Sequence, residues 1–196
     1  MTGEPDRAGA GTSADGLRVL AEARWPEPGD DAPPTLPGFV HSTFSPVVAA
    51  VAERCLTRRH GERPAPQPVG VRTAVVLVSA AGDRSGADHV HATVARGGRP
   101  GPLFFFQSVP NSVAGHVAAR WGLGGPVVCV APIGDPLAEG MAQAGLLRYD
   151  GDADETLLIM IEQVPEDAGA GVTAGTPGDA PGTRALAVLL GGGDTR

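Results

Sequence analysis

The stretch RTAVVLVSA, residues 72–80, decides the fold class of this chain. Its centre, residues 75–78, is an unbroken aliphatic run, which is typical of a strand covered on both faces in a parallel sheet. Two later stretches, GPVVCVA at 125–131 and TLLIMIEQV at 156–164, have the same character. The sequence therefore predicts three buried strands.

Helical patterns separate these strands. In residues 45–59 the apolar side chains fall at helical spacing, with Ser45 as the expected N-cap and Pro46 at the favoured first position. Three further helices are predicted, over about residues 86–96, 111–121 and 135–149. Asn111 or Ser112 is the expected cap of the second of them.

Two more strands are predicted outside this central part. Residues 17–25 alternate between apolar and polar side chains, as a half-covered strand does, and RALAVLLGG at 184–192 is expected to close the edge of the sheet. Strands that alternate with helices form α/β folds. We expect a layered α/β fold, with a mixed, mostly parallel sheet and helices on both faces.

The domain organisation follows from the composition along the chain. Residues 1–16 are mostly small and polar and are predicted to be a disordered tail. Residues 17–193 are expected to form a single domain. Within it, the Gly-, Ala- and Pro-rich residues 165–183 are predicted to be a flexible surface insertion.

The charged residues exclude several functions. All 15 basic residues are Arg, so a Schiff-base lysine or a P-loop lysine is excluded. The net charge of −7 and the absence of a basic run argue against a nucleic-acid partner. There is no apolar stretch of the roughly 20 residues needed to cross a bilayer, and the polar start does not resemble a signal peptide. We expect a cytoplasmic protein without a membrane partner.

Three motifs resemble the amino-terminal half of a β-ketoacyl synthase, which has a thiolase-type fold. They are SVPNSVAGHVAARWGLGGP at 108–126, the strand VVCVA directly after it, and GLLRYDGDADETLLIMIEQ at 145–163. The resemblance covers roughly residues 17–164 and is closest to short ketosynthase-like amino-terminal domains of polyketide and polyene pathways. It implies that the layered sheet is one half of a thiolase-like fold.

The departures from this family pattern concern catalysis. The resemblance implies a nucleophilic cysteine about eight residues beyond Pro126, at a helix N-terminus that stabilises its thiolate. Gly134 occupies that place, and Cys129 comes five positions too early. The family's two catalytic histidines belong to a carboxy-terminal half, and none of the five histidines here matches them. The resemblance therefore implies a non-catalytic partner or scaffold, similar to a chain length factor, with no cofactor and no metal.

The resemblance also implies an interface. The short strand at 127–130 would pair with its mate across a two-fold axis, so it is either internal or covered by a partner. The Phe-rich stretch GGRPGPLFFFQSVPN, residues 97–111, is expected to be a loop, and in the resembled fold it would approach the dimer axis and the acyl tunnel. The candidate interface residues are Phe104, Phe105, Phe106, Asn111, Val127, Val128, Cys129 and Val130. The expected partner is a complete ketosynthase or a second copy, and an acyl carrier protein could meet Arg120.

An enzymatic alternative remains open. A small acyltransferase or thioesterase could use Cys129 or Ser112 as its nucleophile, with His116 as the nearby base. The simpler interpretation of Cys129, and of Cys55, is a small buried hydrophobe.

Two other pairs of polar residues have structural interpretations. His89 and His91 could begin a metal site but are more simply surface residues. Asp135 and Glu139 could be an acid–base pair but are more simply placed to interact with a helix dipole.

Overall fold

The computed structural model describes residues 16–32, 34–164 and 182–192. The predicted tail, except Gly16, and residues 165–181 of the predicted insertion lie outside the described residues. The described residues form one five-stranded sheet in the order β1-β5-β4-β2-β3. Its strands are β1 (Leu17–Trp25), β2 (Thr73–Val78), β3 (Val127–Val130), β4 (Glu155–Val164) and β5 (Gly182–Gly192).

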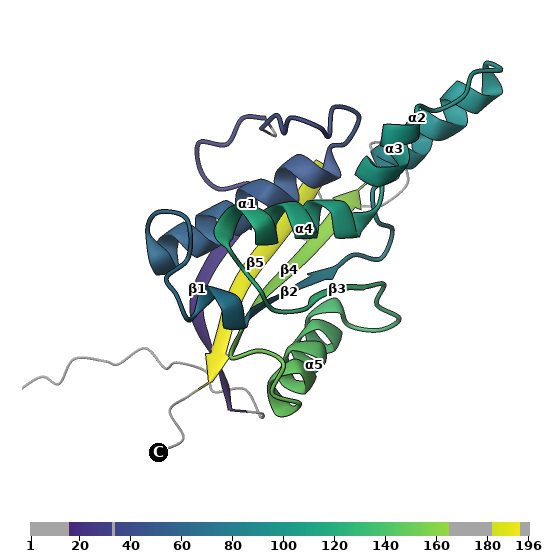
Figure 1. The fold of residues 1–196 in the computed structure, drawn as a ribbon. Coiled ribbons are helices and arrows are strands. Elements are labelled where there is room, and N and C mark those ends of the chain that lie inside the picture. Colours follow the sequence, from purple (N-terminus) through teal and green to yellow (C-terminus); the bar gives the residue numbers. More distant parts are fainter. Residues whose placement is uncertain (1–15, 33, 165–181, 193–196) are drawn as a thin grey trace, which may run out of the picture.

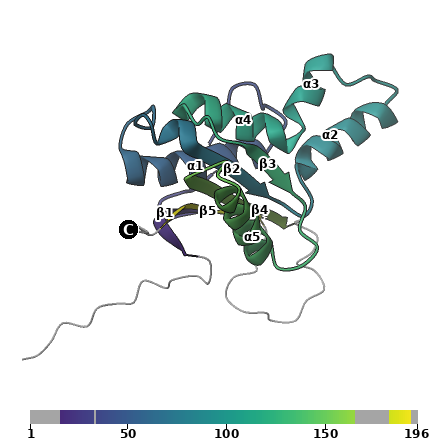
Figure 2. The same cartoon turned by 60° about the horizontal axis from the view of Figure 1, so that its bottom comes forward.

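The sheet is mixed, as predicted. Strand β2 runs parallel to β3 and β4, whereas β5 runs antiparallel to β1 and β4. The α-helices are α1 (Phe44–His60), α2 (Arg84–Ala95), α3 (Pro102–Gln107), α4 (Pro110–Trp121) and α5 (Pro136–Tyr149). Helices α1 and α4 cover one face of the sheet and α5 lies on the other, while α2 and α3 extend beyond the sheet as an arm (Figures 1 and 2). The predicted α/β class with helices on both faces is confirmed.

Two apolar cores explain this layering. The larger core joins the predicted stripe of α1, including Val48, Val51 and Cys55, to the sheet face formed by alternate residues such as Leu77. The smaller core joins Ala144 of α5 to the opposite sheet face. Because β2 and β4 contribute alternate side chains to both cores, their sequences are continuously apolar.

The final strand is not at the sheet edge, which corrects the prediction for residues 184–192. Strand β5 lies between β1 and β4. It is buried on both sides, with Ala187 and Leu189 in the larger core and Val188 and Leu190 in the smaller one. Such a strand must be internal, and the edges are β1 and β3.

The buried side chains of β1 lie on different faces of the sheet at its two ends. A register shift between Val19 and Ala21 interrupts its pairing with β5. Leu17 therefore belongs to the smaller core, and Ala23 and Trp25 belong to the larger one. A bulge inserts one residue and so breaks the simple alternation that the sequence predicted.

The helix starts differ from the predicted caps. Helix α1 begins at Phe44 after Thr43, and Ser45 is inside it, donating its backbone N–H to Oγ of Ser42 at 2.8 Å. Helix α4 begins at Pro110, and its N-cap is Val109 rather than Asn111 or Ser112. Proline at the first helical position needs no N–H partner, which explains a start without a side-chain cap.

Candidate functional site

Strand β3 has one open side. Its residues pair in parallel only with β2, in the register Val75↔Val127 to Val78↔Val130, and no described strand lies on its other side. The carbonyl oxygens of Pro126 and Val130 accept hydrogen bonds from β2 and from Ser79 after it. Because backbone groups alternate in direction along a strand, Val127 and Cys129 direct their N–H and C=O groups to the open side.

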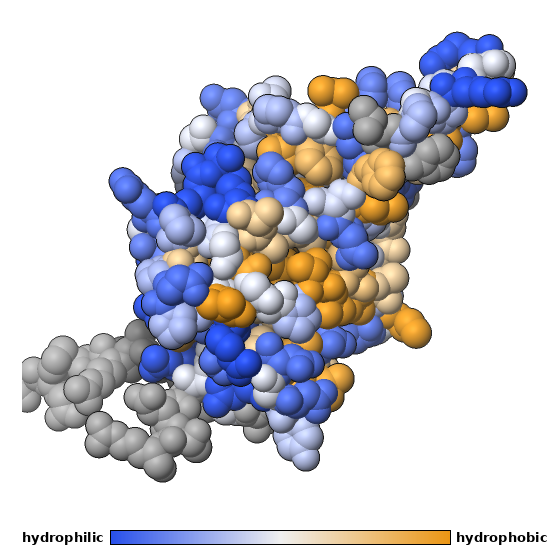
Figure 3. Space-filling view, viewed as in Figure 1, coloured by the Kyte–Doolittle hydropathy of each residue, from blue (hydrophilic) through white to orange (hydrophobic). Residues whose placement is uncertain are grey.

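The side chains of β3 are only partly covered. Val128 and Val130 pack against the smaller core, whereas Val127 is 37% exposed and Cys129 is exposed. Figure 3 shows apolar side chains gathered around the place where β3 lies in Figure 1. The interpretation of Cys129 as buried filler is therefore wrong, because an edge strand lacks a second neighbour. Cys55, by contrast, is buried as predicted.

Cys129 also lacks the surroundings of a nucleophile. Partial burial raises the pKa of its thiol, and no positive neighbour opposes this effect. A nucleophilic cysteine needs the reverse, a pKa lowered by a cation or a helix N-terminus.

The turn before α5 is where the family resemblance places a nucleophile. Gly134 lies in this turn, and Asp135 is the N-cap, accepting a hydrogen bond from the N–H of Ala138 at 2.6 Å. Oε1 of Glu139 accepts hydrogen bonds from the N–H groups of Ile133 at 2.9 Å and Gly134 at 2.5 Å. Asp135 and Glu139 therefore have the predicted structural role. Two carboxylates occupy the N–H groups that would otherwise stabilise an anion at this helix start.

The serine and histidine of the enzymatic alternative, Ser112 and His116, each contact another residue. Oγ of Ser112 donates a hydrogen bond to the carbonyl oxygen of Phe106. The ring of His116 lies one turn further along α4, in edge contact with Phe39 at 6.0 Å between centroids. Asn111 is exposed at the start of the same helix. The hydroxyl of Ser112 is thus engaged with a backbone carbonyl, and among the described residues its hydrogen-bond partner is Phe106 rather than His116.

The Phe-rich stretch is a helix, α3, rather than the predicted loop, with Pro102 at its first position. Phe104 is buried against two histidines, with ring centroids 5.9 Å from His41 and 5.1 Å from His89. These two imidazole rings stack at 3.9 Å. His89 therefore has a packing role instead of lying free on the surface, and Phe104 is unavailable to a partner.

Phe106 remains an interface candidate, since it is 71% exposed on the arm. The side chain of Phe105 lies outside the described set. Within the described ranges, no three His, Cys, Asp or Glu side chains come together as ligands for a metal ion. None of the described helices is both long enough and apolar enough to span a membrane.

Comparisons with solved structures identify the fold. A chain of the ketosynthase–chain length factor complex from Xenorhabdus doucetiae matches with a TM-score of 0.61 and 22% identity, over 84% of this chain and 65% of that one. The ishigamide ketosynthase/chain length factor matches with a TM-score of 0.64 and 18% identity, over 86% of this chain and 49% of that one. This chain has a ketosynthase-like fold.

A third match with this ketosynthase-like fold is a type II polyketide synthase complex of an acyl-carrier protein with its ketosynthase. Its TM-score is 0.59 at 12% identity, over 90% of this chain and 63% of that one. This chain thus spans between 49% and 65% of the length of these three structures. No protein-family model matches the sequence, and no curated protein matches it.

Sequence reasoning missed how Glu139 reaches back to Ile133 and Gly134. The spacing of Asp135 and Glu139 indicated a helix start. The hydrogen bonds of Glu139 to residues five and six positions earlier, however, depend on how the turn folds. It also missed a pocket between α1 and α4 that contains His116 and Arg120. No sequence motif marks this pocket, because its residues come from three separate segments.

Proposed function

We propose that this chain is a non-catalytic subunit with a ketosynthase-like fold that pairs through β3 with a complete ketosynthase or with a second copy. Its role would resemble that of a chain length factor in polyketide or fatty acid biosynthesis. The observation that carries the proposal is the open, apolar edge of β3, with Val127 and Cys129 exposed on it.

The edge of β3 favours strand addition. An unpaired strand presents a row of N–H and C=O groups, and proteins normally protect such edges with charges, prolines or a covering element. Strand β3 consists of Val and Cys alone and has no charged residue. Antiparallel pairing about a two-fold axis would satisfy the outward groups of Val127 and Cys129 and continue the sheet into the partner.

The turn before α5 supports the non-catalytic part of the proposal. The carboxylate of Glu139 accepts the N–H groups of Ile133 and Gly134, and that of Asp135 accepts the N–H of Ala138, so an anionic thiolate or oxyanion at this turn would be repelled. The chain would then contribute shape and surface, and its partner would supply the chemistry.

The kind of partner is suggested by the solved structures with the same fold. Two of them contain a ketosynthase and a chain length factor, and a third contains an acyl-carrier protein bound to a ketosynthase. A carrier protein is therefore a further expected partner of the assembled complex, and Arg120, half-exposed on α4, is a candidate contact for an acidic carrier.

The test is the mass of the purified protein by light scattering after size exclusion, alone and mixed with a complete ketosynthase from the same source. We expect a homodimer or a stoichiometric complex. Val127→Lys places a charge at the open edge and should abolish that species. Val19→Lys is the matched control, since Val19 is 55% exposed on β1 at the opposite edge.

Two results would contradict the proposal. One is a protein that stays monomeric and does not bind the ketosynthase at any concentration tested. The other is an assembly that survives Val127→Lys and is lost in Val19→Lys, which would move the interface to β1. Circular dichroism of both variants separates loss of pairing from loss of folding.

A further inference from the structure

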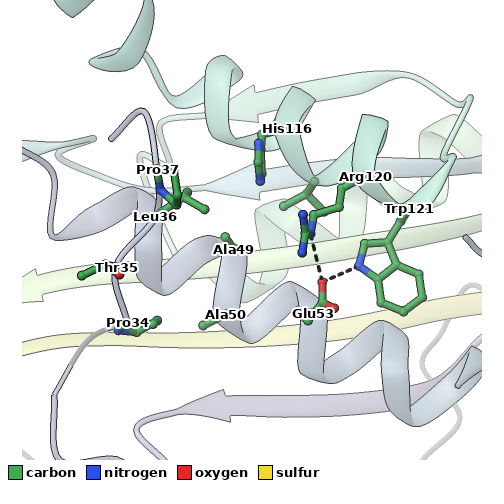
Figure 4. A pocket seen from close by; sticks show the side chains of 11 residues that line it. Pro34, Thr35, Leu36, Pro37, Ala49, Ala50, Glu53, His116, Arg120 and Trp121 are labelled. Atoms are coloured by element: carbon green, nitrogen blue, oxygen red, sulfur yellow. Dashed lines mark hydrogen bonds and ion pairs between the residues drawn. The ribbon is translucent and has the colours of Figure 1, made fainter. Parts of the chain in front are cut away.

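A pocket of about 540 Å³ lies between α1 and α4, beneath the segment 34–37 (Figure 4). Its walls are mostly apolar and include Leu36, Ala49, Ala50 and Val117. Pockets of 300–1,000 Å³ with apolar walls and a few polar groups are typical of small-molecule sites. This pocket is on the outer side of the helix layer and does not include β3, so it is independent of the proposed pairing.

The sequence of α1 explains why the pocket is hollow and apolar. The first half of α1, from Phe44 to Ala52, has no charged residue. Its larger side chains, such as Val48 and Val51, point into the core. The outward positions carry Ala49 and Ala50, whose small side chains leave the space unfilled.

The polar end of the pocket is built around Glu53. One of its oxygens accepts a hydrogen bond from Nε1 of the buried Trp121 at 2.9 Å, and the other lies 2.9 Å from Nε of Arg63. Nε of Arg120 is 3.9 Å from Glu53, which is too far for a hydrogen bond. Glu53 and Arg120 are the charged groups that line this end of the pocket, and Arg63, which contacts Glu53 from outside the lining, partly neutralises its carboxylate.

Arg120 and His116 can act on the same ligand. They are four residues apart on α4, so they share one face of the helix. Figure 4 shows both side chains directed into the space between α4 and α1. Burial and the charge of Arg120 lower the pKa of His116, so its ring is neutral near pH 7 and can donate one hydrogen bond.

We propose that this pocket binds a small organic carboxylate, with the carboxylate on Arg120 and His116 and an apolar body against Ala49, Ala50 and Leu36. A guanidinium group with free donors matches a carboxylate in shape and charge. A phosphate dianion fits less well, because the carboxylate of Glu53 lies beside Arg120 and opposes a second negative charge. An ion without an apolar body would leave the apolar wall formed by Ala49 and Ala50 exposed to water.

The pocket predicts a pH dependence of binding. A bound carboxylate stabilises the protonated form of His116 and raises its pKa, so the affinity should rise as the pH falls through that pKa. The charged groups that face the ring are Arg120 on its own helix and Glu53 on α1, and Arg63 contacts Glu53. Both oxygens of Glu53 are already in contact with other groups, one with Trp121 and the other with Arg63.

The experiment is a titration of the full chain with hexanoate, followed by NMR signals of the His116 ring and the Trp121 indole N–H. We expect saturable shifts of both signals and a rise in the pKa of His116. Arg120→Gln should weaken binding about tenfold or more, because a charge-assisted contact is lost. Arg96→Gln, an exposed arginine at the end of α2, is the matched control and should bind like the parent protein.

Comparison ligands test the two halves of the proposal. Hexanol lacks the charge and inorganic phosphate lacks the apolar body, so both should bind more weakly than hexanoate. Ala50→Leu should block the pocket. If Ala50→Leu fails to fold, the binding of hexanoate to Arg120→Gln tests the proposal without it. Absence of shifts with hexanoate, equal binding of hexanol, or unchanged binding in Arg120→Gln would each overturn the proposal.

Discussion

Gly134 donates its backbone N–H to the carboxylate of Glu139 at a distance of 2.5 Å. This contact places the negative charge of Glu139 in the turn before α5. Gly134 is the position at which the resemblance to ketosynthases implies a nucleophile. The carboxylates of Asp135 and Glu139 make this turn unfavourable for a thiolate, which supports the proposed non-catalytic role.

A cysteine introduced at position 134 should not become a nucleophile. A Cβ at position 134 would lie 3.3 Å from Oε1 of Glu139, a contact that this flexible side chain can relax. In a Cys129→Ser background, we expect Gly134→Cys to fold and its thiol to have a pKa at or above about 8.5, because the nearby carboxylates oppose the thiolate. The pH dependence of iodoacetamide alkylation measures this pKa.

The control for that experiment is Glu139→Gln added to Gly134→Cys. Removing the charge should lower the pKa of the thiol and speed its alkylation at pH 7. A low pKa in Gly134→Cys alone would show that the turn still favours an anion, and the non-catalytic interpretation would lose its electrostatic support.

Gly140 sets the distance between α5 and the sheet. A Cβ there would lie 2.6 Å from Cδ1 of Leu158 and 3.2 Å from Cγ2 of Val78. We expect Gly140→Ala to lower the free energy of unfolding by about 1–3 kcal/mol through overpacking. Gly115 of α4 is the matched control, because a Cβ there meets nothing within 4 Å. Gly115→Ala should stabilise the protein by up to about 1 kcal/mol. Urea unfolding distinguishes the two, and equal effects would contradict the packing argument.

Acidification should destabilise the protein through His60. Its side chain is 4% exposed, and burial lowers its pKa despite the nearby Glu155. The unfolded chain, with an ordinary pKa near 6.5, therefore binds a proton first as the pH falls. This contribution to stability is present above about pH 6.5 and is lost as the pH falls toward the pKa of the folded state.

The measurement is urea unfolding at pH 7 and pH 5, for the parent protein and for His60→Gln. The variant should lose less stability between the two pH values. The pKa of His116 is also lowered, so this residue makes stability depend on pH with the same sign. That contribution should remain in the His60→Gln variant. A parent protein that becomes more stable at pH 5 would contradict this account.

The two cysteines should report on the interface. Cys129 is exposed at the edge strand, whereas Cys55 is buried and its thiol pKa is raised to about 12. In the unpaired Val127→Lys variant, maleimide should modify Cys129 and leave Cys55 intact, as read by mass spectrometry. In the homodimer or the complex with a ketosynthase, Cys129 should be protected. Unchanged labelling of Cys129 in a stable complex would place the interface elsewhere.

The sequence predicted the elements that have strong periodic patterns. The apolar stripe of α4, with Val113, Val117 and Trp121, is buried as expected, because a 3.6-residue period has few other interpretations. The apolar run of β2 is buried on every residue, as a strand covered on both faces should be. Local pattern and tertiary environment agree in these elements.

The order of the strands could not be read from the sequence. Strands β3 and β5 are both apolar, yet β3 is an edge and β5 is internal. Nothing local distinguishes Cys129, which is exposed, from Leu189, which is fully buried, because their burial depends on which strand lies beside them. The contacts of Glu139 with Ile133 and Gly134, and the place of Arg120 in a pocket, were equally inaccessible, since each depends on groups brought together only in the folded chain.

The position of β5 has a consequence for how the molecule is made. Strand β1, at the start of the described chain, pairs with no described strand except β5, so Leu17 meets Gly192. During synthesis on the ribosome, the edges of β1 and β4 that pair with β5 stay unpaired until residues 182–192 emerge, because β5 is the last of the described strands. Unpaired edges of this kind invite aggregation. A prematurely terminated chain should therefore be recognised by chaperones and proteases rather than accumulate as a smaller folded protein.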